Sequence, residues 1–107
     1  MAYSSNAAEV LDALGDPTRR AVLELLRDGP RAVVDIASEL PVSRPAVSQH
    51  LRVLKGAGLV TERRDGARRL YRVDPEGLGA LRIYLETFWT DALAAFKEVA
   101  EQEGEHR

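Results

Sequence analysis

Residues 36–73 read IASELPVSRPAVSQHLRVLKGAGLVTERRDGARRLYRV, and this stretch decides the fold. Its first part, 36–57, predicts a helix-turn-helix. Apolar residues spaced three or four apart predict one helix over 32–40, although no capping residue precedes it, and a second helix over 43–57. Only the three residues Pro41-Val42-Ser43 separate the two patterns, and Ser43 is a good N-cap for the second helix.

The second part, 59–73, predicts a β-hairpin. Two short strand-like runs, 59–64 and 67–73, flank Asp65-Gly66. Asp-Gly is a strong hairpin signal because both central positions of a tight turn favour residues that tolerate positive φ. A helix-turn-helix followed directly by a basic hairpin predicts a winged helix-turn-helix, with the hairpin as the wing.

The flanking sequence predicts three further helices. Asn6 is expected to cap a first helix that ends near Gly15, and Asp16-Pro17 to open a second helix that closes at Gly29-Pro30. A final long helix is predicted over 75–103. The fold class is therefore mainly α with a small β-hairpin wing, and residues 1–107 are expected to form a single domain.

Composition excludes several classes of protein. The chain has 107 residues, of which 45% are hydrophobic, as in an ordinary globular protein. No apolar run is long enough to span a membrane, and the N-terminus has no secretory signal, so we expect a cytoplasmic protein without a membrane partner. With no cysteine and two histidines, the chain has few metal ligands. We expect no metal, no cofactor, no catalytic residues and no enzymatic activity.

Charge is unevenly distributed along the chain. Residues 43–73 contain eight basic and two acidic side chains, whereas the other residues contain seven basic and fifteen acidic ones. This asymmetry is typical of a protein with one surface that faces a polyanion, although a merely solvated hairpin would look similar.

The polar face of the second helix and the wing are the expected DNA-binding surface. Side chains in the first half of the helix can reach base edges or phosphates in the major groove, and those farther along can reach the backbone. Gln49 is either a base contact or an ordinary exposed glutamine, and His50 is either a DNA contact or a packing residue. The expected DNA-binding residues are Ser43, Arg44, Pro45, Ser48, Gln49, His50, Arg52, Lys55, Arg63, Arg64, Arg68 and Arg69.

A broad apolar stripe runs along the predicted last helix. Its members recur every three or four residues, and Trp89 widens the stripe beyond what one small domain needs to bury. The stripe favours a subunit interface, whereas the alternative is that it closes the core of the monomer.

The stretch from Leu11 to Val73 resembles the ArsR-type (ArsR/SmtB) family of bacterial repressors. Three motifs carry the resemblance: Asp-Pro-Thr-Arg at 16–19, Ser-x-x-x-Val-Ser-x-His-Leu at 43–51, and Leu-x-x-Ala-Gly-Leu-Val at 54–60. The resemblance implies a homodimer, formed through the first and last helices, that binds an inverted-repeat operator in double-stranded DNA. The residues then expected at the dimer interface are Val10, Leu11, Leu14, Leu81, Leu85, Phe88, Trp89, Ala92, Phe96 and Val99.

The sequence departs from many members of that family in its lack of metal ligands. Members that release DNA on binding a metal use cysteines in the third helix or a His/Asp/Glu set in the last one, and neither set is present here. The chain therefore resembles the metal-independent branch. A small apolar effector near Phe88, Trp89 and Phe96 is an alternative to aromatic packing between subunits. A winged-helix module that binds another protein is the alternative to a DNA reader, and activation of transcription is an alternative to repression.

Overall fold

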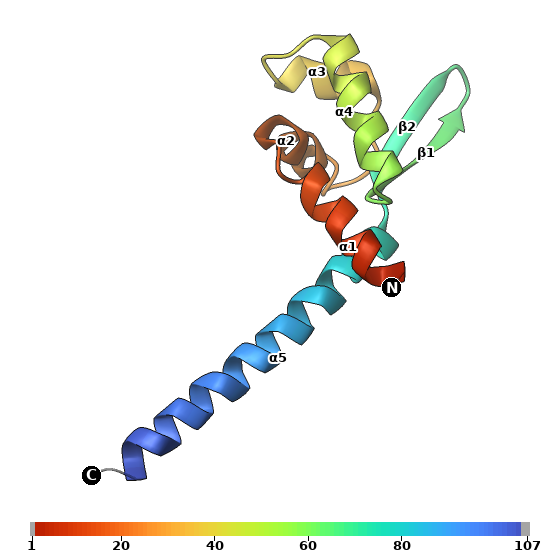
Figure 1. Ribbon diagram of the computed structural model, residues 1–107. Helices are drawn as coiled ribbons and strands as arrows, with labels where there is room; N and C mark the ends of the chain where they lie inside the picture. The colour runs from red at the N-terminus through yellow and green to blue at the C-terminus, as the bar shows by residue number, and fades with distance from the viewer. Residues whose placement is uncertain (1, 106–107) are drawn as a thin grey trace.

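The computed structural model describes the backbone of residues 2–105 and the side chains of residues 7–104. Five helices and one hairpin follow each other along the chain (Figure 1). They are α1 (Ala2–Ala13), α2 (Pro17–Leu25), α3 (Val33–Glu39), α4 (Arg44–Gly56), β1 (Val60–Asp65), β2 (Arg68–Val73) and α5 (Pro75–Glu105). The predicted mainly helical fold with one hairpin is confirmed.

Two of the predicted helix caps are present. The Asp16 carboxylate accepts a hydrogen bond of 3.0 Å from the backbone N–H of Arg19, with Pro17 in the first turn of α2. That hydrogen bond is the main reason why the pKa of Asp16 lies below its ordinary value. Ser43 Oγ accepts a hydrogen bond of 3.2 Å from the N–H of Ala46 at the start of α4. Both contacts satisfy a backbone donor that the first helical turn leaves free.

Several predicted boundaries were wrong. Helix α1 begins at Ala2, so Asn6 lies inside it, because no glycine or proline interrupts the residues before Asn6. Helix α2 ends at Leu25, before the predicted Gly29-Pro30 stop, with a cap at Leu26. Helix α5 ends at Glu105, two residues beyond the predicted bound of 103. Strong helix formers such as alanine and glutamate after Val99 account for that extension.

The hairpin turn was also placed one residue too early. Asp65 pairs with Arg68, so the two central turn residues are Gly66 and Ala67, not Asp65-Gly66. Gly66 has a φ of 64°, and no non-glycine residue within the described backbone has positive φ. A glycine at the first central position is what a type II′ turn requires. The glycine therefore governs the turn, and the aspartate belongs to β1.

The core lies beneath α4. Its largest fully buried side chains come from five elements and from the turns that follow α2 and α4, and α2 and α3 pack against the inner side of α4. These residues are Val10, Val22, Leu26, Ile36, Val47, Leu51, Leu54, Leu59 and Val60. A third strand-like segment joins the hairpin, because Arg31 and Tyr71 exchange backbone hydrogen bonds of 2.9 and 2.8 Å. The hairpin is thus held to the segment that leads into α3.

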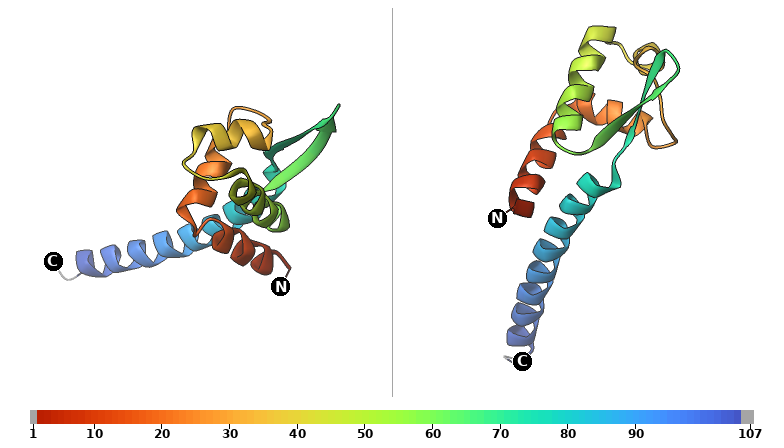
Figure 2. Two further views of the ribbon diagram at one scale, coloured as in Figure 1. Left: turned by 90° about the horizontal axis from the view of Figure 1, so that it is seen from above. Right: turned by 90° about the vertical axis from the view of Figure 1, so that its right-hand side faces the viewer.

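Helix α5 leaves this body as a single long rod. Figure 2 shows the rod and the hairpin projecting toward opposite ends of the molecule, which measures 69 × 29 × 21 Å. Only the beginning of α5 packs on the body, along α1, and every side chain from residue 82 to residue 104 is exposed. None of the described helices combines the length and the apolar character needed to cross a membrane.

Candidate nucleic-acid interface

Helix α4 presents one polar face to solvent. Val47, Leu51 and Leu54 are fully buried on its inner side. The exposed residues share the opposite side, and they are Arg44, Pro45, Ser48, Gln49, Arg52, Lys55 and Gly56. Gln49 Oε1 accepts a hydrogen bond of 3.4 Å from Arg52, so the two side chains lie next to each other on the surface. The face is continuous and basic, and an α-helix of this kind fits the width of a DNA major groove.

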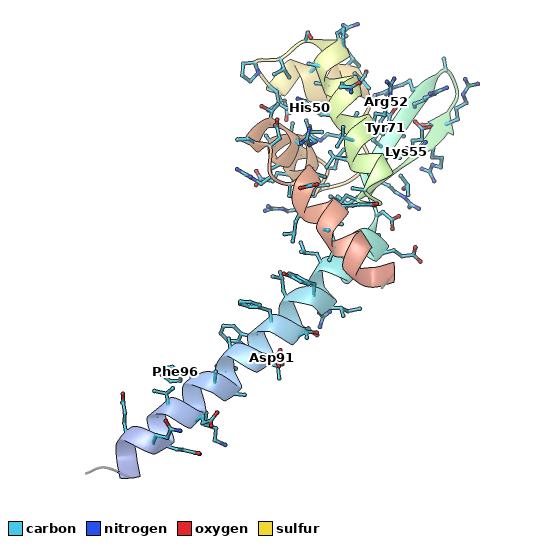
Figure 3. The ribbon with its side chains drawn as sticks, in the orientation of Figure 1. His50, Arg52, Lys55, Tyr71, Asp91 and Phe96 are labelled. Carbon is cyan, nitrogen blue, oxygen red and sulfur yellow. The ribbon has the colours of Figure 1, made fainter. Side chains whose placement is uncertain are left out.

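His50 does not belong to this polar face. Its side chain is half-buried, and Nδ1 is buried without a hydrogen-bond partner among the described residues. Figure 3 shows His50 on the side of α4 that faces α2, whereas Arg52 and Lys55 lie on the side that faces the hairpin. Of the two interpretations of His50 drawn from the sequence, packing is therefore the one that fits the structure.

The hairpin carries exposed arginines on both of its faces. Residues directly opposite in an antiparallel pair share a face, and Arg64 lies opposite Arg69. Arg63 and Arg68 point to the other face, because side chains alternate along a strand. Two like charges directly opposite destabilise a bare hairpin. The arrangement therefore favours an anionic partner such as a phosphate backbone.

A polar cleft of about 310 Å³ lies between α4 and the hairpin. Its basic groups are Arg52, Lys55 and Arg69, and its one carboxylate is Glu62. Lys55 Nζ lies 2.9 Å from Glu62 Oε1, and Arg69 lies 4.0 Å from Glu62 Oε2. Three cations against one carboxylate leave the cleft positively charged, so it is suited to an anion.

The pKa values in the cleft follow from these contacts. The hydrogen bond from Lys55 is the main cause that holds the pKa of Glu62 below its ordinary value, so the carboxylate stays ionised near neutral pH. Burial, followed by the hydrogen bond to Glu62, raises the pKa of Tyr71, so the phenol keeps its proton. The Glu62 carboxylate is thus a negative charge beside Lys55 and Arg69, and the Tyr71 phenol is neutral.

The structure also places one acidic residue of α3 against the wing. Asp35 Oδ2 lies 2.7 Å from Arg68, 33 positions away in the sequence. Sequence reasoning missed Asp35, Glu62 and Tyr71 as parts of this surface. Alternation along the strands could have placed Glu62 and Tyr71 on the face of Arg64, but no local signal could have paired Asp35 with Arg68.

The apolar stripe of α5 is exposed in the single chain, so it does not close the core of the monomer. Phe88 is 67% exposed, Trp89 64% and Phe96 74%. Leu85, Ala92, Val99 and Leu11 of α1 are exposed as well, while Leu14 and Leu81 are partly buried against the core. Val10 was wrongly expected at a subunit interface: it is fully buried in the core beside α4 and has no surface to offer a partner.

A shallow apolar hollow of about 510 Å³ lies on α5 beside this stripe. Leucine and aromatic side chains line it, and the ion pair of Arg82 with Glu86, 2.9 Å long, borders it. Among the side chains that the structure describes, no three histidine, aspartate or glutamate residues come together as metal ligands. The hollow thus offers a mainly apolar surface with one ion pair at its border.

Known proteins share this arrangement. The family model described as bacterial regulatory protein, arsR family, matches residues 16–62. The chain is 56% identical over 93 residues to the HTH-type transcriptional regulator Rv2034 of Mycobacterium tuberculosis, and the match covers 87% of each protein. It is 46% identical over 67 residues to the HTH-type transcriptional repressor SmtB of the same species, across 63% of this chain and 50% of that repressor.

A solved structure is similar over almost the whole chain. It is the solution NMR structure of the homodimeric winged helix-turn-helix DNA-binding domain Mb0332 from Mycobacterium bovis, described as a possible ArsR-family transcriptional regulator. The TM-score is 0.66 at 33% identity, and the match covers 99% of this chain and 88% of that one. The match therefore extends over the residues of α5 as well as those of the helix-turn-helix and the wing.

Proposed function

Because the chain belongs to the ArsR family of bacterial regulatory proteins, we propose that it represses transcription by binding an inverted-repeat operator as a homodimer in the cytoplasm. As a member of this family, it is a DNA-binding transcriptional regulator with a winged helix-turn-helix fold. The observation that carries the proposal is the basic surface that α4 and the wing form together, in a chain whose other residues are mainly acidic. The repressor name of a relative supports repression over activation.

Each part of that surface has its own role in the proposal. Helix α4 enters the major groove, where Ser48 and Gln49 read base edges and Arg44 and Ser43 contact phosphates near the start of the helix. Arg52 and Lys55 contact the backbone beside the groove. The wing arginines, Arg63, Arg64, Arg68 and Arg69, contact phosphates or the adjacent minor groove.

The second subunit packs on the exposed stripe of α5. Phe88, Trp89 and Phe96 together expose a large apolar surface, which a soluble monomer rarely leaves uncovered. The homodimeric state of the similar NMR domain supports this arrangement. Two-fold symmetry would then place the two α4 helices about 34–36 Å apart, so that each subunit reads one half-site.

We also propose that DNA binding does not depend on a transition metal. The chain contains no cysteine and two histidines, so it lacks the thiolates and the imidazole cluster that hold such metals. A chelator and added Zn²⁺ should both leave the DNA affinity unchanged. An affinity that falls on adding Zn²⁺ would reject this part of the proposal.

Selection of bound fragments from random DNA, followed by a salt titration on the enriched sequence, tests the proposed function. We expect an inverted repeat with half-sites about one helical turn apart and an affinity that falls steeply with salt. No enriched sequence, or binding indifferent to salt, would instead favour a winged-helix module that binds another protein through its basic wing.

A further inference from the structure

Two carboxylates of the protein already form ion pairs with cations of the proposed DNA-binding surface. Asp35 holds Arg68 at 2.7 Å, and Glu62 holds Lys55 at 2.9 Å. We propose that Asp35 and Glu62 restrain DNA binding: each pairs with a basic group that would otherwise meet a phosphate, and each must be exchanged for phosphate when DNA binds. The inference rests on the proposed function, because it concerns the same surface.

The hairpin register gives each of its faces a separate carboxylate. Glu62 lies opposite Tyr71 and shares a face with Arg64 and Arg69, the face that turns toward α4. Arg68 points to the other face, where α3 supplies Asp35. The two ion pairs are therefore independent contacts that act on different sides of the same wing.

The exposure of these groups suits an exchange with phosphate. The side chains of Arg68, Lys55 and Arg69 are 57%, 51% and 59% exposed, so a phosphate can reach them without any unfolding. Exposed ion pairs are weak, typically worth less than about 1 kcal/mol, and therefore exchange readily. Carboxylate and phosphate oxygens also offer the same acceptor geometry to arginine.

The carboxylates oppose DNA in two ways. A phosphate must first displace the carboxylate from its cation, and the displaced negative charge then stays close to the DNA backbone. Asp35 and Glu62 remain 49% and 26% exposed, so neither is shielded from that backbone. Phosphate contacts carry no sequence information, so the restraint acts equally on operator and random DNA.

Neutral variants of the two carboxylates test the inference. We would measure the affinities of the wild type, Asp35→Asn and Glu62→Gln for random duplex DNA and for the selected operator, between about 50 and 200 mM salt. The matched control is Asp91→Asn, which removes the same charge from an exposed site on α5, far from the wing (Figure 3). Circular dichroism would check that each variant folds, and either carboxylate variant alone suffices if the other fails to fold.

We expect each carboxylate variant to bind both DNAs about two- to fivefold more tightly at low salt, while the control stays near the wild type. Because each cation reaches its phosphate in the wild-type complex as well, the number of neutralised phosphates does not change, and the slope of the salt dependence should stay close to that of the wild type. Unchanged or weaker binding of the folded variants would overturn the inference. Weaker binding would mean that the carboxylates hold the cations in position for DNA. A wild type that binds neither DNA would instead reject the proposed function itself.

Discussion

Truncation of Phe88 should separate the subunits without unfolding them. An aromatic side chain buries about 150–250 Å² when fully covered, and Phe88 is 67% exposed, which leaves about 100–170 Å² for a partner to cover. At about 25 cal/mol per Å², covering that area is worth about 2.5–4 kcal/mol in each subunit. Two-fold symmetry doubles the effect. Since area converts to affinity incompletely, we expect Phe88→Ala to raise the dimer dissociation constant at least about a hundredfold.

Sedimentation equilibrium over a range of protein concentrations measures this change directly. The matched control is Thr90→Ala, because Thr90 is exposed on the same helix and, two positions after Phe88, does not share its face. The helical content of both variants should equal that of the wild type, since neither side chain belongs to the core. If Phe88→Ala dimerises as tightly as the wild type, the stripe on α5 is not the subunit interface.

Four further outcomes are expected. Replacing Arg68 and Arg69 together by alanine should weaken binding to all DNA. A filter-binding titration should show that the slope of the salt dependence falls by about 0.9 for each phosphate that the wing no longer neutralises. An unchanged slope would mean that the two arginines do not contact DNA. Gln49→Ala should weaken DNA binding by about 1–3 kcal/mol, and the loss should depend on the base at particular operator positions. If the affinity falls equally across a panel of mutated operators, Gln49 contacts only the DNA backbone. Leu51→Ala should lower the free energy of unfolding by about 2–5 kcal/mol in urea, because Leu51 is fully buried, and a loss below about 1 kcal/mol would contradict that burial. The folded pKa of Asp16 lies below 3.8, so its stabilisation is complete above that pH and is lost as the pH falls through the folded value. Asp16→Asn keeps an acceptor for the helix cap but cannot titrate, so the melting temperature of the variant should fall less at acid pH than that of the wild type. Identical melting temperatures of the two proteins across the pH range would contradict this role of Asp16.

Much of the fold could be predicted because its signals are local. The caps at Asp16 and Ser43 lie within three residues of the backbone donors that they satisfy. The inner face of α4 follows from a spacing of three and four residues. Helix boundaries were less predictable. The start of α1 and the ends of α2 and α5 differ from expectation, because no cap or helix breaker stands at the residue where each of these boundaries falls.

The candidate site was predictable in outline and less so in detail. The sequence indicated a basic wing and a polar helix, and the structure shows both exposed. It could not decide between the two interpretations of His50, because a residue at the border of a helix face turns inward or outward according to what packs beside it. It also assigned Val10 to a subunit face, whereas packing against α4 buries it completely.

By itself, the sequence determined the order of the elements, the amphipathic faces and the charge asymmetry, since each depends on residues only a few positions apart. Only the tertiary structure decided which opposite charges meet: Asp35 with Arg68 across 33 positions, and Glu62 with Lys55 across seven. It also decided that the aromatic stripe of α5 stays uncovered in the single chain. The physical reason is that ion pairing and burial depend on distances through space, which the packing of α3, α4 and the wing sets and no local pattern encodes.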